Sequence, residues 1–144
     1  MKPNETHLEF LQNNINRMNQ CSFQMKGWAI TVVSALIALY ASSITEANSG
    51  NQLYLYSAIA SSFLFWYLDS LYLSKERKFV AIYNDVIGVG NSKGQKVEPI
   101  NEYEIPVNRY KGWKYCIFRA MISPSEIVLY GVIIIGLIAF CCIV

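Results

Sequence analysis

Two acidic residues at the end of one apolar segment are the first candidates for chemistry. Asp69 is the only charge between Leu53 and Leu73, and a carboxylate within such a segment is costly unless it faces protein or water. Glu76 follows seven residues later, so a helix places both acids on nearly one face. Around the axis of an assembly of several copies, that face forms stacked acidic rings, which attract cations. The predicted pore-lining residues are Asp69, Tyr72, Leu73 and Glu76.

Asp69 also has two other interpretations. An ion pair with Lys26 or Arg17 would hold two helices together, because a nearby cation stabilises a buried carboxylate. A proton relay would use the carboxyl group to pass a proton through the membrane. The sequence leaves these three roles open.

Basic and aromatic residues are interleaved shortly before the last apolar segment. Basic side chains neutralise phosphates, and aromatic faces stack on bases, so this pattern predicts a site for a nucleotide or an oligonucleotide. Cytoplasmic positive charge combined with an aromatic belt at the membrane interface gives the same composition, and this alternative stays open. The ligand-binding candidates are Arg109, Lys111, Trp113, Lys114 and Arg119.

The other reactive side chains form no catalytic or metal-binding motif. His7 is the single histidine, and we expect it to lie exposed on the first helix. The four cysteines include no Cys-x-x-Cys pair, so we interpret them as small apolar residues rather than zinc ligands. We therefore expect no enzymatic activity, no metal and no cofactor.

The composition is typical of a membrane protein. Of 144 residues, 53% are hydrophobic and only 15% are charged, whereas soluble domains carry about 25% charged residues. Spanning a bilayer takes about 20 apolar residues, and residues 27–44, 53–73 and 127–144 come close to this length. The predicted fold class is therefore all-α: one membrane domain with three transmembrane helices.

Basic residues predict the orientation, because they are enriched on the cytoplasmic side of a membrane. Residues 45–52 contain no lysine or arginine, whereas residues 74–123 contain nine. We expect the N-terminus and the long loop in the cytoplasm, the C-terminus in the periplasm and the spans in a bacterial inner membrane. The basic residues on the cytoplasmic side are Lys2, Arg17, Lys26, Lys75, Arg77, Lys78, Lys93, Lys96, Arg109, Lys111, Lys114 and Arg119.

Two helical segments are predicted outside the membrane. Residues 1–22 form an amphipathic helix, with Thr6 as its N-cap and an apolar seam that includes Leu8 and Leu11. We expect this seam to pack on protein, and the alternative is a helix on the membrane surface. The second span continues into the cytoplasm as a helix that ends near Gly88 or Gly90, where it pairs with the N-terminal helix.

The long connection, residues 74–123, is predicted to become less regular after this helix. Residues 91–94 indicate a turn, and residues 111–121 indicate a short interfacial helix. Ser123 as N-cap and Pro124 at the first helical position predict the start of the last helix. Glu126 then lies in the first turn of that helix.

Part of the chain resembles known membrane effectors. Residues 23–29, Phe-Gln-Met-Lys-Gly-Trp-Ala, enter an apolar hairpin that closes with residues 66–79, Trp-Tyr-Leu-Asp-Ser-Leu-Tyr-Leu-Ser-Lys-Glu-Arg-Lys-Phe. This pattern is similar to small bacterial membrane proteins encoded beside nucleotidyltransferases, above all the Hailong effectors of anti-phage defence. The two-span hairpin also resembles the SLATT effector group. The resemblance covers roughly residues 8–87.

The resemblance implies a function in defence. It implies a homo-oligomeric channel, a tetramer, that depolarises the membrane and acts as a toxin. It also implies a nucleotidyltransferase partner, whose product controls the channel, and a single-stranded DNA oligomer as the ligand that keeps it shut. The implied arrangement is insertase-like, with three spans and a cytoplasmic helix pair.

These observations predict a cation-conducting membrane effector that is controlled by a nucleotide or an oligonucleotide. Its expected partners are membrane lipid, further copies of the chain and the nucleotidyltransferase. One alternative is a non-conducting scaffold or insertase-like chaperone that binds a partner through its cytoplasmic helices. Another is a sensor whose loop binds a nucleotide and passes the signal on.

Overall fold

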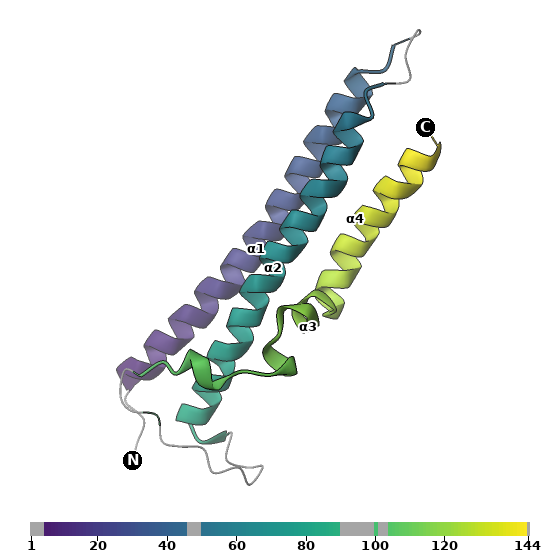
Figure 1. Cartoon of the computed structure of the whole chain (residues 1–144). Helices are drawn as coiled ribbons and strands as arrows, with labels where there is room; N and C mark the ends of the chain where they lie inside the picture. The colour runs from purple at the N-terminus through teal and green to yellow at the C-terminus, as the bar shows by residue number, and fades with distance from the viewer. Residues whose placement is uncertain (1–4, 46–49, 90–99, 101–103, 144) are drawn as a thin grey trace.

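The computed structural model describes residues 5–45, 50–89, 100 and 104–143, which form helices and turns without a β-strand. Helices α1 (Glu5–Ser42) and α2 (Leu53–Val86) form a long antiparallel hairpin, and α4 (Pro124–Ile143) lies along α2 (Figure 1). The all-α prediction is confirmed for these residues. The connection from α2 to α4 contains η2 (Val107–Arg109), η3 (Trp113–Tyr115) and α3 (Ile117–Met121).

Some predictions fall outside the described residues. These concern the positive charges of Lys2, Lys93 and Lys96, the turn at residues 91–94 and the alternative helix end at Gly90.

Helix α1 is one continuous helix of 38 residues. The predicted amphipathic segment and the first apolar span are therefore two parts of the same element. Thr6 is not the N-cap, because the helix already includes Glu5. The prediction that His7 lies exposed is wrong: 3% of it is exposed, because it lies one turn before the fully buried Leu11 on the same face.

Helix α2 extends well beyond the predicted span and ends close to the predicted position. Its last residue is Val86, and Gly88 has a φ of +82°, a left-handed conformation that favours glycine. Leu11 of α1 and Ile82 of α2 are both fully buried, so the two helices also pack at this end. The predicted pairing of the N-terminal helix with the extension of the second span is confirmed.

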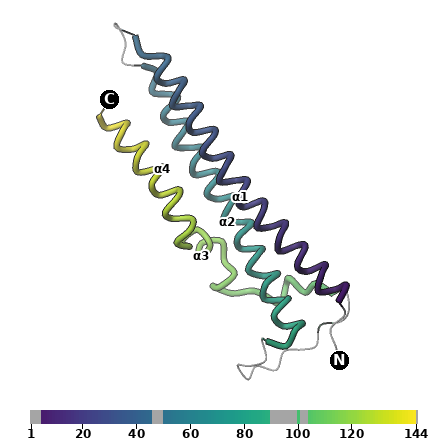
Figure 2. The backbone as a smooth tube through the Cα atoms, turned by 180° about the vertical axis from the view of Figure 1, so that it is seen from behind, coloured from purple at the N-terminus to yellow at the C-terminus, as the bar shows by residue number. Residues whose placement is uncertain are grey.

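Helix α4 joins the hairpin through an apolar core. Val33, Ala58 and Leu137, one from each long helix, form its buried centre. The helix begins at Pro124, as predicted, and the carbonyl of Ser123 accepts a hydrogen bond from the Ile127 amide at 3.0 Å. In the views of Figures 1 and 2, α2 lies between α1 and α4.

Within the described residues, two helices, α1 and α4, are long and apolar enough to cross a membrane. Only 17% and 22% of their most apolar stretches are buried within the protein. Val128, Val132 and Ile135 of α4 are each about two-thirds exposed, at 66%, 69% and 68%. Helices in the core of a soluble protein bury such side chains, so these faces are compatible with a lipid environment.

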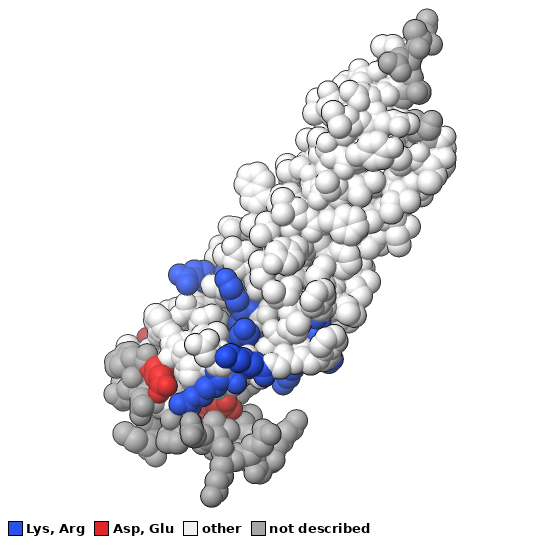
Figure 3. Space-filling model, viewed as in Figure 1, with Lys and Arg blue, Asp and Glu red and all other residues white. Residues whose placement is uncertain are grey.

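Charge is concentrated at one end of the molecule. On the face shown in Figure 3, lysine and arginine gather around the connection between α2 and α4, and the opposite end is free of them. The end of α1, the start of α2 and the C-terminal end of α4 all lie at that opposite end (Figure 1). The polar end therefore contains the residues that are available for a site.

Candidate functional site

A cluster of charged side chains lies where α1, α2 and α4 meet. The Nζ of Lys26 donates hydrogen bonds to Asp69 Oδ2 at 2.6 Å and to Glu126 Oε1 at 2.8 Å. The two carboxylate side chains are 0% and 1% exposed, whereas the lysine side chain is 24% exposed. One ammonium group thus links the three long helices. We call Ser22, Lys26, Asp69, Glu126 and Tyr130 the charged junction.

Asp69 receives hydrogen bonds from α1 and α4. Besides Lys26, Ser22 donates to its Oδ1, and Tyr130 donates to its Oδ2 at 3.1 Å. A buried carboxylate is tolerated in apolar surroundings when its charge is paired and its oxygens accept hydrogen bonds. Of the two partners considered for Asp69, Lys26 makes the ion pair. Arg17 donates instead to a side chain of its own helix, at 3.2 Å.

Glu126 is less well satisfied than Asp69. Its Oε1 accepts the hydrogen bond from Lys26, but its buried Oε2 has no hydrogen-bond partner among the described residues. Sequence reasoning missed this residue, because an acid in the first turn of a helix already has a local explanation. Lys26 and Glu126 are 100 positions apart, and nothing in a single sequence links them.

Helical spacing explains how the charged junction is built. Ser22 and Lys26 are one turn apart on α1, so both face α2, and the Lys26 Nζ also donates to the Ser22 Oγ at 3.0 Å. Glu126 and Tyr130 are one turn apart on α4 and are both buried. Asp69 of α2 lies between these two pairs, so each pair supplies it with a hydrogen-bond donor.

A hollow of about 320 Å³ lies beside the charged junction. It brings Leu73 and Glu76, two of the predicted pore-lining residues, together with Glu126. Burial raises the pKa of Glu76 above its ordinary value, although the positive charges of Arg77 and Lys26 oppose the shift. We call this space the junction hollow. Its lining residues are Asn19, Ser22, Phe23, Lys26, Leu73, Glu76, Ser125 and Glu126.

The other predicted pore-lining residues lie elsewhere. Asp69 is fully buried within a single copy of the chain. Tyr72 does not line the junction hollow, and the Lys75 ammonium lies 5.9 Å from the centre of its ring. A pore role for Asp69, Tyr72, Leu73 and Glu76 stays a prediction, because it concerns how several copies assemble.

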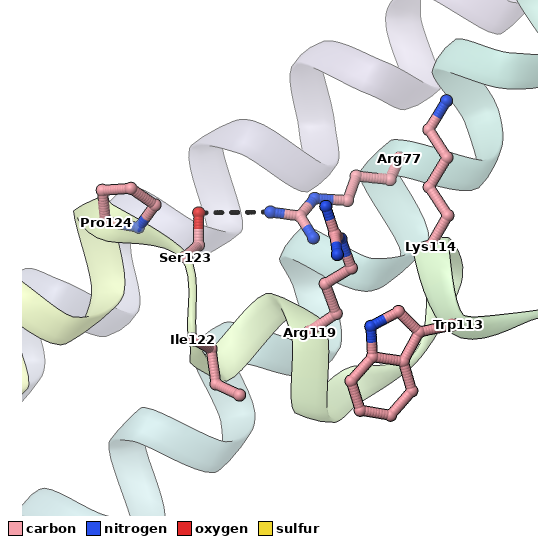
Figure 4. A pocket seen from close by; sticks show the side chains of 7 residues that line it. All are labelled: Arg77, Trp113, Lys114, Arg119, Ile122, Ser123 and Pro124. Carbon is pink, nitrogen blue, oxygen red and sulfur yellow. Dashed lines mark hydrogen bonds between the residues drawn. The ribbon is translucent and has the colours of Figure 1, made fainter.

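A second hollow, of about 510 Å³, lies where the connection meets α2 and the start of α4. Figure 4 shows the guanidinium groups of Arg77 and Arg119 converging on one region of it. In the described part of the chain, neither arginine forms an ion pair with an acidic residue. Positive charge without an internal partner favours an anion here. We call this space the basic pocket. Its lining residues are Arg77, Trp113, Lys114, Arg119, Ile122, Ser123 and Pro124.

The basic pocket is attached to the start of α4. Arg77 belongs to α2, and its Nη2 donates a hydrogen bond to the Ser123 Oγ at 3.1 Å (Figure 4). Ser123 immediately precedes Pro124, the first residue of α4. A change at Arg77 therefore acts directly on the residue from which α4 begins.

Hydrogen bonds fix the connection against α2 and so shape the basic pocket. The Ser74 hydroxyl donates to the Tyr115 carbonyl at 2.7 Å, and Trp66 donates to the last carbonyl of α3 at 3.3 Å. The Tyr110 hydroxyl donates to the carboxylate of Asp85. Burial and this hydrogen bond raise the pKa of Tyr110 well above its ordinary value, so the donor stays protonated at neutral pH.

The structure brings three of the five predicted ligand-binding residues together. Trp113, Lys114 and Arg119 all line the basic pocket. Arg109 is not among the lining residues and forms an ion pair with an acidic residue of its own segment at 3.5 Å. Lys111 is exposed and also lies outside the pocket lining. The two residues that do not line it precede η3, the element that contributes Trp113 and Lys114.

Sequence reasoning assigned Arg77 to cytoplasmic positive charge and missed its place in the basic pocket. A usable signal was present in the spacing of α2. Ser70, Ser74 and Arg77 follow one another at steps of four and three residues, which places them on one face of the helix. Ser74 on that face binds the connection, so the face that carries Arg77 is the one that the connection covers.

Comparisons of the chain with protein-family models, curated proteins and solved structures found no match. The described residues hold no group of three or more His, Cys, Asp and Glu side chains that could bind a metal ion. All four cysteines are free thiols. Two candidate sites stand out among the described residues: the charged junction, whose lysine pairs with two acids, and the basic pocket, whose arginines form no ion pair with a described acidic residue.

Proposed function

We propose that the chain is a membrane effector in which α1, α2 and α4 all cross the bilayer. The apolar outer faces of α1 and α4 support this, since lipid covers such side chains without cost. Because α2 lies between these two helices (Figure 2), it crosses with them. The polar end, with its lysines and arginines (Figure 3), lies in the cytoplasm of a bacterial cell, and the C-terminus lies in the periplasm.

The basic pocket is the receptor site of this effector, and its composition carries the proposal. Guanidinium groups bind phosphate through paired, charge-assisted hydrogen bonds. Trp113, which is 64% exposed at the rim, offers a face on which a base can stack. Two arginines beside one tryptophan match a ligand that combines phosphate with an aromatic base. The ligand class is therefore a nucleotide or a short single-stranded oligonucleotide.

Ligand binding is coupled to the membrane segment through Arg77. A bound phosphate that accepts from Nη2 of Arg77 displaces the Ser123 hydroxyl from that donor, because each N–H donates mainly to one acceptor. Loss of the bond to Ser123 releases the start of α4 from α2. The charged junction begins three residues later at Glu126, so a displaced α4 changes the packing of all three helices.

The activity that the ligand controls is conduction through a homo-oligomer. Three helices of one copy are too few to enclose an aqueous pore, so a pore requires a ring of copies. Glu76 in the junction hollow supplies the negative charge that selects cations at the cytoplasmic end. The resemblance to anti-phage effectors adds the biological setting: a tetrameric, depolarising toxin that is held shut by the product of a nucleotidyltransferase. No part of the proposal requires enzymatic activity of this chain.

A binding measurement tests the receptor site. We expect purified protein in detergent to bind a fluorescently labelled single-stranded oligodeoxythymidylate, and the combined Arg77→Ala and Arg119→Ala variant to lose this binding. Lys111→Ala is the matched control, since it removes a nearby positive charge that does not line the pocket. Equal binding by all three proteins would contradict the assignment of the basic pocket.

A flux measurement tests conduction separately. Protein in liposomes that hold a potassium gradient should release potassium, and the oligonucleotide should change the rate in the unsubstituted protein but not in the double arginine variant. Liposomes that stay tight under all conditions would exclude a channel, even if the oligonucleotide binds.

An insertase-like chaperone is the alternative that the structure gives a specific reason to retain. An apolar groove of about 360 Å³ lies between α1 and α4. Such a groove can hold an apolar segment of another membrane protein. Its lining residues are Val33, Ile37, Val132, Ile133, Gly136, Leu137 and Phe140.

Crosslinking distinguishes the two functions. A photoreactive residue in place of Val132, which is 69% exposed at the groove, should link to a second copy of the chain in a channel. In a chaperone it should link to newly made membrane proteins, and the membrane potential of expressing cells should stay intact.

A further inference from the structure

The charged junction contains more negative than positive charge. Lys26 contributes one positive charge, whereas Asp69 and Glu126 contribute two negative charges when both are ionised. The remaining titratable groups that face this site are Glu76 of α2, across the junction hollow, and the Tyr130 phenol of α4. Within the described segments no second basic residue pairs with either carboxylate. One negative charge is left without a counter-ion.

The surplus charge falls on Glu126. Asp69 accepts hydrogen bonds from three side chains, those of Ser22, Lys26 and Tyr130. Glu126 accepts one, and its Oε2 is buried without a partner in the described part of the protein. A buried ionised oxygen with no donor is strongly disfavoured. Because both carboxylates contact the same Nζ, they are also close enough to repel each other.

A proton on one carboxylate neutralises the surplus negative charge and needs fewer ligands than a metal cation does. A bound cation needs several oxygen ligands, and the described residues supply no cluster of three or more ligating acidic, histidine or cysteine side chains. A proton needs one oxygen, and Glu126 Oε2 is the unpartnered one. We propose that Glu126 is a proton-binding residue, protonated in the resting protein, and that the junction hollow is the path by which its proton exchanges with water.

The protonation state of Glu126 controls how α4 packs against α2. When the proton leaves, two carboxylates share one ammonium group in a buried site, and their repulsion acts between α2 and α4. The same helix is attached at Ser123 to the basic pocket. The inference does not depend on any ligand of that pocket, so it can hold even if the proposed receptor function fails.

Infrared spectroscopy of the intact protein in liposomes tests the proposal. A protonated carboxylic acid has a carbonyl stretching band that a carboxylate lacks. We expect this band at neutral pH, its loss on raising the pH, and its absence from the Glu126→Gln variant. Glu76→Gln, which removes the other acid of the junction hollow, should retain the band. A band that survives in Glu126→Gln, or one that is absent from the unsubstituted protein, overturns the proposal.

Isotope labelling distinguishes a protonated glutamate from a protonated aspartate without a substitution in the charged junction, and in the Glu76→Gln background it excludes the other acid of the junction hollow. Protein grown with carboxyl-¹³C glutamate should show a shifted band, because heavier carbon lowers the stretching frequency. Protein grown with carboxyl-¹³C aspartate should show an unshifted band. A shift with aspartate alone would place the proton on an aspartate and overturn the assignment to Glu126.

Thermal unfolding in different salts tests the competing cation. With sodium, potassium or choline chloride at equal ionic strength, the unfolding midpoint should be the same within error. If the midpoint were higher in sodium or potassium, and this increase were absent from Glu126→Gln, the counter-charge would be a metal cation. That result would overturn the proposal that Glu126 is protonated.

Discussion

The charged junction and the basic pocket lie at the two ends of the same short segment, Ser123 to Glu126. They differ in whether their charged side chains are paired within the protein. In the junction, one ammonium group is shared by two buried carboxylates within 2.8 Å. In the pocket, Arg77 and Arg119 lie together, and neither has an acidic partner among the residues that the structure describes. Charge that is paired internally holds helices together. Charge that is left unpaired at a surface is available to a ligand.

This difference separates stability from binding. Substitutions in the charged junction should change unfolding and leave the affinity of the basic pocket nearly intact. Substitutions in the basic pocket should weaken ligand binding and leave the unfolding midpoint nearly unchanged. Variants that change both the unfolding midpoint and the affinity would show that the two sites are not independent.

The largest expected effect is that of Lys26→Met. It leaves the buried Asp69 carboxylate without its counter-ion and Glu126 without its hydrogen-bond donor, which costs about 3–5 kcal/mol, so the unfolding transition in detergent should move sharply to lower temperature. Lys75→Met is the matched control, because Lys75 is exposed and its ammonium lies over the Tyr72 ring, 5.9 Å from the ring centre, and its effect should stay within about 0.5 kcal/mol. Similar midpoints for the two variants would show that the junction ion pairs do not hold the helices.

The next largest effect is that of Trp113→Ala on oligonucleotide binding. Loss of base stacking costs about 1–3 kcal/mol, which corresponds to a roughly 5- to 150-fold weaker affinity, with no change in the unfolding midpoint. Phe118→Ala controls for the loss of an exposed aromatic residue, since Phe118 is 67% exposed and does not line the basic pocket. Equal weakening by both would place the ligand outside the pocket.

A smaller effect is expected for Tyr110→Phe, which removes the hydrogen bond to Asp85. It should destabilise the protein by about 1 kcal/mol at neutral pH. The pKa of Tyr110 is raised in the folded protein, so its stabilising contribution is present below the ordinary phenol pKa and is lost as the pH rises through the raised value. The two proteins should therefore converge in stability at strongly alkaline pH. Tyr67→Phe, at an exposed tyrosine, should show neither change.

The smallest effect on affinity is expected for Ser123→Ala, which separates ligand binding from its transmission to α4. The variant keeps both arginines, so the oligonucleotide should bind within about twofold of the original affinity. It lacks the acceptor for Arg77, so binding should no longer change potassium release from liposomes. A ligand response that persists in this variant would show that another contact links the pocket to α4.

The sequence predicted the elements better than their contacts. Apolar length predicted helices at α1, α2 and α4, and Gly88 and Pro124 predicted where α2 ends and where α4 begins, because glycine and proline act through local backbone geometry. That α1 is continuous was not predicted, since the capping pattern at Thr6 and the change from polar to apolar residues both indicated a separate segment.

The two sites were predicted only in part. Lys26 was considered as a partner of Asp69, because both residues lie at the same end of neighbouring spans. Glu126 and Arg77 were assigned local roles, in a helix start and in cytoplasmic charge. Their long-range partners depend on how α4 and the connection fold back on α2, and a single sequence contains no periodic signal for that.

The continuity of α1 has a mechanical consequence. At about 1.5 Å per residue, its 38 residues extend for about 57 Å, well beyond the roughly 30 Å thickness of a hydrocarbon core. The rod has no joint between His7, near its outer end, and Lys26 in the charged junction. A force applied to α1 near His7 is therefore transmitted along the helix to Lys26, whose ammonium group contacts both Asp69 and Glu126.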